Sequence, residues 1–174
     1  MSSERRTSIL ATALQLFADE GYHATTTRHV AQAAGVSEGL IFRHFGSKEG
    51  LLKAVMTLGE ERIHMLYEHL LTEEDARSMI RQAIAIPFEV PTSQYPFWRL
   101  LYKLKWELNI GPDEKMKPLE QALTRAFERL AIPYPEREAI HLVRTMDAIG
   151  GEILRGVLTD LEAEKEWLMV RYGV

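Results

Sequence analysis

Polar and basic side chains gather in one short segment, AAGVSEGLIFRHFGSKEGLL at residues 33–52. Its basic members are Arg43, His44 and Lys48. Ser37 and Ser47 stand where helix N-caps are expected, and the free N–H groups at the helix start near Ser37, like those near Thr26, can bind phosphate. The segment therefore has the chemistry of a phosphate-binding surface. Glu38 does not fit this pattern, because a carboxylate beside a phosphate is repelled by it.

A helix, a glycine-containing turn and a second helix must carry these side chains. The stretch TTTRHVAQAAG (25–35) predicts a short helix that Thr25 or Thr26 caps and that Gly35 ends. Residues 38–45 predict the next helix. This is the pattern of a helix-turn-helix unit, whose second helix enters the major groove of DNA. Periodicity alone fits two packed helices with a solvated face equally well.

Helical spacing of apolar residues continues along the chain, without strand-type alternation. The expected helices are 5–20, 25–35, 38–45, 47–56, 60–71, 73–86, 95–110, 114–130, 136–158 and 160–171. Gly59 is a possible break between 47–56 and 60–71, which form one helix without it, and 87–96 is expected to be a proline-rich loop. The sequence predicts an all-α fold of about nine helices. A DNA-binding domain is expected at 1–47, and a helical effector-binding and dimerisation domain at 48–174.

The overall composition is that of an ordinary globular chain. Of its 174 residues, 46% are hydrophobic and 26% charged, with a net charge of −4 and no cysteine. Disulfides and thiolate metal sites are therefore excluded. No apolar run is long enough to cross a membrane, and the N-terminus lacks a secretory signal, so a cytoplasmic protein is expected. Because the total charge is negative, a grip on nucleic acid must come from where the basic residues lie.

A longer pattern makes the function more specific. Residues 9–55, ILATALQLFADEGYHATTTRHVAQAAGVSEGLIFRHFGSKEGLLKAV, contain A-x-x-L-F-x-x-x-G-Y, T-T-x-R-x-V-A, A-G-V-S-x-G and F-x-S-K-E-x-L. This nearly continuous set resembles the N-terminal DNA-binding domain of the TetR family of transcriptional regulators. The resemblance implies a homodimeric regulator, most simply a repressor, that binds double-stranded palindromic operator DNA and is released by a small-molecule effector. It implies neither enzymatic activity nor a cofactor.

Positions carried over from the family give a set of DNA-binding residues. Those that would meet phosphate near the start of the second helix are Thr25, Thr26 and Arg28. Those that would face base edges or the groove wall are Ser37, Glu38, Gly39 and Leu40. Those that would hold the backbone on the far side are Arg43, His44 and Lys48. Phe42 completes the set; it stands where the family commonly has Tyr, whose hydroxyl reaches a phosphate, and it cannot make that bond.

Two further positions depart from the family pattern. Leu40 stands where Thr is frequent, and it offers apolar contact of the kind that suits a thymine methyl group. Glu38 stands where a basic residue is frequent. It either accepts a hydrogen bond from a cytosine amino group or serves as a favourable charge at a helix N-terminus, and the sequence does not separate these two uses.

The second domain contains an aromatic stripe. Trp98, Tyr102 and Trp106 recur every four residues on the helix expected at 95–110. They could form one wall of a pocket for a hydrophobic effector, with polar anchors among His64, Tyr67, Arg144 and Asp147. Ordinary core packing is the alternative for each aromatic side chain.

The helix expected at 136–158 is broadly apolar and has glycine in its middle, where glycine costs about 1 kcal/mol relative to alanine. Close approach of a second chain would explain that cost. The expected dimer interface comprises Met146, Gly150, Ile153, Leu154, Val157 and Trp167. A slight kink against the chain's own core is the alternative.

Two Glu-x-x-His pairs require a test of metal chemistry, since helical di-iron proteins use such pairs. They are Glu61 with His64 and Glu138 with His141. The two additional inward-facing glutamates of such a site are not evident, so we expect no metal. No hydrolase, P-loop or dinucleotide motif occurs either.

Overall fold

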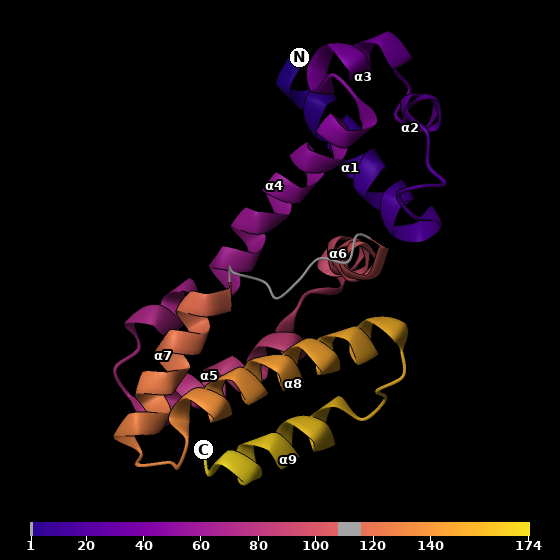
Figure 1. The fold of residues 1–174 in the computed structure, drawn as a ribbon. Coiled ribbons are helices and arrows are strands. Elements are labelled where there is room, and N and C mark those ends of the chain that lie inside the picture. The colour runs from indigo at the N-terminus through magenta and orange to yellow at the C-terminus, as the bar shows by residue number, and fades with distance from the viewer. Residues whose placement is uncertain (1, 108–115) are drawn as a thin grey trace. The chain divides into compact units, whose positions relative to one another are not determined.

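The computed structural model describes residues 2–107 and 116–174, with side chains except at 2, 3, 59–63 and 105–107 (Figure 1). Over these residues the chain is entirely helical, with nine α-helices and two short 3-10 helices, which confirms the predicted all-α fold. The α-helices are α1 (Ser2–Glu20), α2 (Thr27–Ala33), α3 (Glu38–Phe45), α4 (Lys48–Tyr67), α5 (Ala76–Glu89), α6 (Tyr95–Glu107), α7 (Lys117–Arg129), α8 (Pro135–Arg155) and α9 (Leu161–Tyr172). The 3-10 helices are η1 (Glu68–Thr72) and η2 (Thr92–Gln94).

Two expected helix ends are wrong. Gly59 does not break α4, which runs on to Tyr67. Glycine in a helix interior lowers stability by about 1 kcal/mol but neither removes a donor nor clashes, so the neighbouring turns can carry it. Pro87 does not end α5 either, because α5 reaches Glu89. Proline so close to a helix end disturbs only the last turn.

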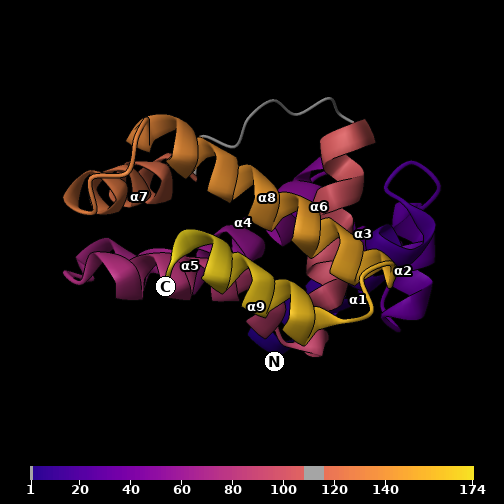
Figure 2. The same cartoon turned by 90° about the horizontal axis from the view of Figure 1, so that it is seen from below.

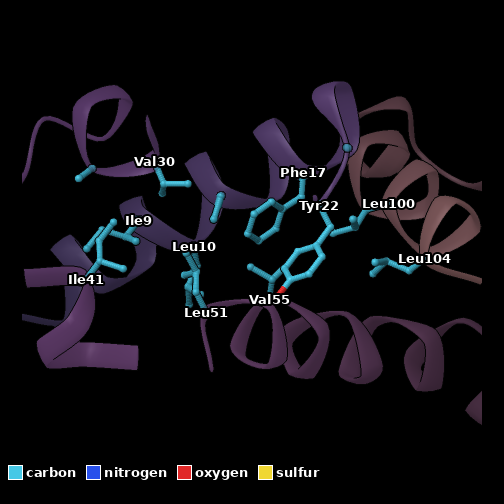
Figure 3. Close-up of a cluster of buried hydrophobic side chains, with 13 residues drawn as sticks. Ile9, Leu10, Phe17, Tyr22, Val30, Ile41, Leu51, Val55, Leu100 and Leu104 are labelled. Atoms are coloured by element: carbon cyan, nitrogen blue, oxygen red, sulfur yellow. The ribbon is translucent and has the colours of Figure 1, made fainter. Parts of the chain in front are cut away.

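The first of two compact units comprises Met1–Ile63 and Ser93–Ile110. Its core brings together buried side chains of α1, α2, α3 and α4, with Leu100 and Leu104 from α6 (Figure 3). The rings of Phe17 and Tyr22 meet edge to face at 5.4 Å in this core. Lys103 on α6 donates to the carbonyl oxygens of Ala18, at the end of α1, and of the next residue. Helix α6 is therefore part of the support of the helix-turn-helix region.

The second unit comprises His64–Thr92 and Gly111–Val174. Within it α5 packs against α7, α8 and α9, and α7 packs against α8. Helix α9 runs back antiparallel to α8 in both views (Figures 1 and 2). Leu168 is the buried residue of α9, and the ring of Tyr172 lies 5.7 Å from that of Phe127. These contacts fix α9 against its own unit.

Candidate nucleic-acid interface

Helix α2 begins at a genuine side-chain cap. The hydroxyl of Thr26 accepts a hydrogen bond from the backbone N–H of His29 at 3.1 Å. The helix ends at Ala33, and Gly35 then adopts a φ of +66°, the left-handed conformation that favours glycine. Of the two threonines predicted as caps, Thr26 is therefore the cap, and Gly35 makes the turn.

Helix α3 follows with a different start from the expected one. Ser37 occupies the N-cap position, but its side chain makes no capping hydrogen bond. The cap prediction was wrong in this respect, and the serine hydroxyl is left on an exposed side chain. Ile41 is fully buried and Val36 packs against the same core, so apolar contacts fix the start of α3.

A hydrogen bond joins the first residues of α2 and α3. The hydroxyl of Thr27 donates to Oε1 of Glu38 at 2.6 Å, across 11 positions of sequence. Sequence reasoning missed this contact, because no local spacing indicates which residue of α2 faces the start of α3. Glu38 is therefore engaged within the protein and half-buried.

The start of α4 is tied to the turn that follows α1. Ser47 caps α4 as predicted, accepting from the backbone N–H of Gly50 at 3.1 Å. The ammonium of Lys48 donates to the carbonyl of His23 at 3.2 Å and lies 4.4 Å from the centre of the Tyr22 ring. An ammonium has three donors, so Lys48 keeps donors for a phosphate.

Glu49 completes this junction. Hydrogen bonds from its own backbone N–H and from Ser47 lower the pKa of the Glu49 carboxyl, so it stays ionised. The Tyr22 hydroxyl donates to Oε1 of Glu49 at 3.4 Å. Burial, and after it the charge of Glu49, raise the pKa of the Tyr22 phenol.

The residues carried over from the family divide by exposure. Those exposed are Thr26, Arg28, Ser37, Gly39, Phe42 and Arg43, and those partly exposed are Glu38, Leu40, His44 and Lys48. Thr25 differs from all of these: it is fully buried, and its hydroxyl donates to the carbonyl of Gly21 at 2.9 Å. Thr25 thus holds the turn after α1 from within, and its side chain is not on the surface.

Two glycines of this region have opposite surroundings. A Cβ added to Gly39 would meet no atom within 4 Å, so nothing inside the chain requires glycine there. A Cβ added to Gly50 would lie 1.9 Å from the carbonyl oxygen of Phe45, so the junction of α3 and α4 does require glycine. Sequence reasoning missed the role of Gly50, because an interior contact with a backbone atom leaves no spacing signal.

The residues predicted for an effector pocket fall in different units. Trp98 and Tyr102 are partly buried on α6 of the first unit, and the side chain of Trp106 lies outside the described residues. Those in the second unit are His64, Tyr67, Arg144 and Asp147, of which only Tyr67 is buried. The structure does not bring these two groups together within either unit.

Two features of the described residues bear on small-molecule binding. Oε1 of Gln94 and Nε1 of Trp98 are buried without a hydrogen-bond partner. They are an acceptor and a donor one helical turn apart in sequence. A separate hollow of about 240 Å³ lies in the second unit, with Met79, Arg125 and Arg129 in its wall, and none of the predicted pocket residues lines it.

The residues predicted for a dimer interface differ in how far their own unit buries them. Met146 and Ile153 are buried within their own unit, and Gly150 and Leu154 are partly exposed. Val157 and Trp167 are exposed, Trp167 by 57%, and Val170 on the same helix by 74%. The exposed apolar surface of the second unit therefore includes Trp167 and Val170 of α9.

The described residues bring no set of metal ligands together. Among the described residues no group of three His, Asp or Glu side chains could hold a metal ion, and the Glu61 side chain lies outside them. His64 instead lies 3.4 Å from Glu68, one turn along the chain. No helix in the described part of the chain has the length and hydropathy to span a membrane.

The comparisons with known proteins agree with this geometry. The family described as "Bacterial regulatory proteins, tetR family" matches residues 9–55, the span from α1 into α4. Residues 9–55 belong to the tetR family. This confirms the resemblance found in the sequence.

Two relatives extend the likeness beyond that region. The transcriptional activator FasR of Mycolicibacterium smegmatis is 32% identical over 71% of this chain and 57% of its own length. The transcriptional repressor KstR2 of Rhodococcus jostii is 32% identical over 50% of this chain and 43% of its own. This chain thus spans less than two thirds of either relative.

Solved structures share the fold. A regulator from Saccharomonospora viridis, solved in complex with choline, superposes with a TM-score of 0.76 at 22% identity. The match covers 95% of this chain and 94% of that one. The likeness in fold therefore includes the helices that follow the helix-turn-helix region.

Proposed function

We propose that this protein is a homodimeric repressor that binds a palindromic operator and is released by a small, hydrophobic effector. The observation that carries the proposal is the tetR-family helix-turn-helix at residues 9–55, with Arg28 and Arg43 exposed on it. As a regulator of transcription it would act on DNA in the cytoplasm. The relatives include both kinds of regulator, since FasR is an activator of transcription and KstR2 is a repressor.

Operator binding would use α3 in the major groove. Phosphate contacts are assigned to Arg28, Arg43 and Lys48, with the capped start of α2 at Thr26 as a backbone anion site. The base-reading or groove-wall residues would be Ser37, Glu38, Gly39 and Leu40, with Phe42 and His44 beside them. Thr25 would act from the interior by holding the turn before α2.

Effector binding is assigned to the aromatic side of α6. Trp98 and Gln94 each have a buried polar atom without a partner, and buried polar groups are nearly always hydrogen-bonded. An effector with one acceptor and one donor on an otherwise apolar body would satisfy both atoms. Tyr102 and Trp106, which belong to the same unit, would extend the apolar contact.

Homodimerisation is assigned to the second unit. A regulator with one short recognition helix needs two half-sites for affinity, which requires a second copy. Apolar side chains that their own unit leaves exposed, Val157, Trp167 and Val170, are the candidate contacts. Gly150 and Leu154 would lie beside them, whereas Met146 and Ile153 would support the interface from the core.

A mobility-shift titration tests the proposal. The DNA upstream of the protein's own gene is compared with a scrambled duplex of equal length at 50 and 200 mM salt. Three basic contacts per half-site make six in a dimer, so specific binding should weaken about 10³-fold between the two salt concentrations. A dimer-sized shift on the upstream DNA alone would support the proposal. Equal, weak binding to both duplexes, on every upstream fragment tried, would contradict it.

A further inference from the structure

The hydrogen bond between Thr27 and Glu38 has properties that a solvated surface contact lacks. At 2.6 Å it is short, as expected when a hydroxyl donates to an ionised carboxylate. The two residues are the first of α2 and the first of α3, and both are partly buried. A Glu side chain loses rotamer entropy when it is ordered, and here that loss occurs on folding and not on binding DNA.

The held carboxylate remains able to accept. Thr27 takes one lone pair of Oε1, and a carboxylate offers about four such sites on two oxygens. Glu38 therefore has accepting capacity for a partner outside the protein. Its neighbour Gly39 has no side chain and has open space around it, so the first turn of α3 leaves room for a base edge.

The charge of Glu38 decides which partner fits. A phosphate or the N7 and O6 acceptors of guanine would repel a carboxylate, whereas an exocyclic amino group donates to it. Adenine carries an N7 acceptor on the same edge as its amino group. Cytosine presents the amino group alone, and Glu is its known side-chain partner in the major groove.

We propose that Thr27 and Glu38 form a specificity-determining pair that selects cytosine at one position of each operator half-site. Glu38 accepts from the cytosine amino group, and Thr27 is a positioning residue that holds the carboxylate in place. This inference rests on the proposed operator binding. It replaces the two uses of Glu38 that the sequence left open with one use and a named supporting residue.

A purely structural tie between α2 and α3 makes a different prediction. If the pair only joined the helices, then removing either side chain would weaken binding to every sequence equally and lower the melting temperature in proportion. A specificity pair instead alters the preference at one base position and leaves the other positions unchanged. The base preference is thus the readout that separates the two roles.

The experiment starts from a duplex library with a randomised 20-base-pair core, selected by full-length wild-type protein. The selected site is then varied one base pair at a time and titrated with wild type, Thr27→Val, Thr27→Ser and Glu38→Ala. Wild type and Thr27→Ser should prefer cytosine by about 5- to 100-fold at one position of each half-site, the usual cost of one wrong base pair. Thr27→Val and Glu38→Ala should lose that preference at that position alone. Circular dichroism checks that each variant is folded. Thr27→Ala replaces Thr27→Val if that variant is unfolded, and Glu38→Met, which has no side-chain oxygen, replaces Glu38→Ala.

The outcomes separate this inference from the proposed function. If wild type selects no sequence at all, operator binding itself is wrong. If wild type selects a site but Glu38→Ala keeps every base preference, Glu38 does not read the DNA. If Thr27→Val keeps the full cytosine preference while Glu38→Ala loses it, the positioning role of Thr27 is wrong.

Discussion

At the residue scale, Gly39 lowers the stability of α3, and no contact within the chain requires glycine at this position. Glycine in a helix costs up to about 1 kcal/mol relative to alanine, and a methyl group at this position would touch nothing in the chain. Close approach of a group from outside, such as a base edge, would be a physical reason for glycine here. We therefore expect Gly39 to be needed for the approach of DNA and not for the stability of the free protein.

Gly39→Ala should therefore separate stability from binding. We expect the free protein to melt higher, with a gain of up to about 1 kcal/mol in the free energy of unfolding. Binding to the selected operator should weaken by roughly 5- to 100-fold, as for one poorly accommodated base pair. Thermal denaturation and mobility-shift titration measure the two effects. Unchanged operator affinity would show that the first turn of α3 does not lie against DNA.

Gly50→Ala offers the matched comparison, since the same methyl group would lie 1.9 Å from a backbone oxygen of Phe45. The backbone at the start of α4 must shift to accommodate it, and forced shifts of this kind destabilise by about 1–3 kcal/mol. Chemical denaturation should therefore place Gly50→Ala below wild type and Gly39→Ala above it. A Gly50→Ala variant as stable as wild type would mean that the α3–α4 junction is looser than described.

At the scale of elements, the junction of α1 and α4 contains a phenol that titrates. Burial and the nearby Glu49 charge raise the pKa of Tyr22 above its ordinary value of 10.0. The neutral phenol is therefore favoured in the folded state. Its contribution to stability is complete below pH 10 and is lost as the pH rises through the higher folded pKa.

Tyr22→Phe removes this titration while keeping the ring against Phe17. We expect the melting temperature of the variant to fall less than that of wild type between about pH 9 and pH 11. Tyr172, whose pKa is also raised mainly by burial, titrates in both proteins and is the internal reference. Equal alkaline losses in both proteins would mean that Tyr22 does not contribute to this pH dependence.

Caps and turns of the first unit could be predicted from residues that are close in sequence. Contacts between different elements could not be predicted in this way. The bounds of α3, the Thr26 and Ser47 caps and the turn at Gly35 all depend on residues within four positions of one another. The tie from Thr27 to Glu38 joins residues from different elements, as does the bond from Lys48 to the carbonyl of His23. Such contacts depend on how helices cross, which apolar periodicity does not determine.

At the scale of the whole molecule, the apolar face of a helix does not show which other helix packs against it. The aromatic stripe on α6 was predicted from spacing, but the packing of α6 on α1 was not. The domain boundary predicted after residue 47 separates two functions. The compact units instead divide after Ile63, within α4, and after Thr92, shortly before α6. The residues predicted for a pocket therefore fall in two different units, and spacing along the chain does not reveal this division.

Helix α9 leads to the last prediction, because its apolar residues lie on opposite sides. Leu168 is buried within the second unit, while Trp167 and Val170 are exposed by 57% and 74%. A helix of a monomer usually turns its apolar side chains to one face, so a second apolar face is typical of an interface. We expect this face to meet a second copy, in the symmetric pairing that homodimers use.

Trp167→Glu should convert a dimer to a monomer while leaving the second unit folded. A charge in the centre of an apolar interface would be buried without a partner, which commonly costs several kcal/mol. Phe42→Glu is the matched control. It also replaces an exposed aromatic ring by a carboxylate, at a side chain that is 47% exposed in the helix-turn-helix region. Sedimentation at micromolar concentration should show a monomer for Trp167→Glu and a dimer for Phe42→Glu. Operator binding should be lost in both, in the first because two half-sites are no longer joined and in the second because a carboxylate faces phosphate. A dimer that persists in Trp167→Glu would place the interface on another surface of the second unit.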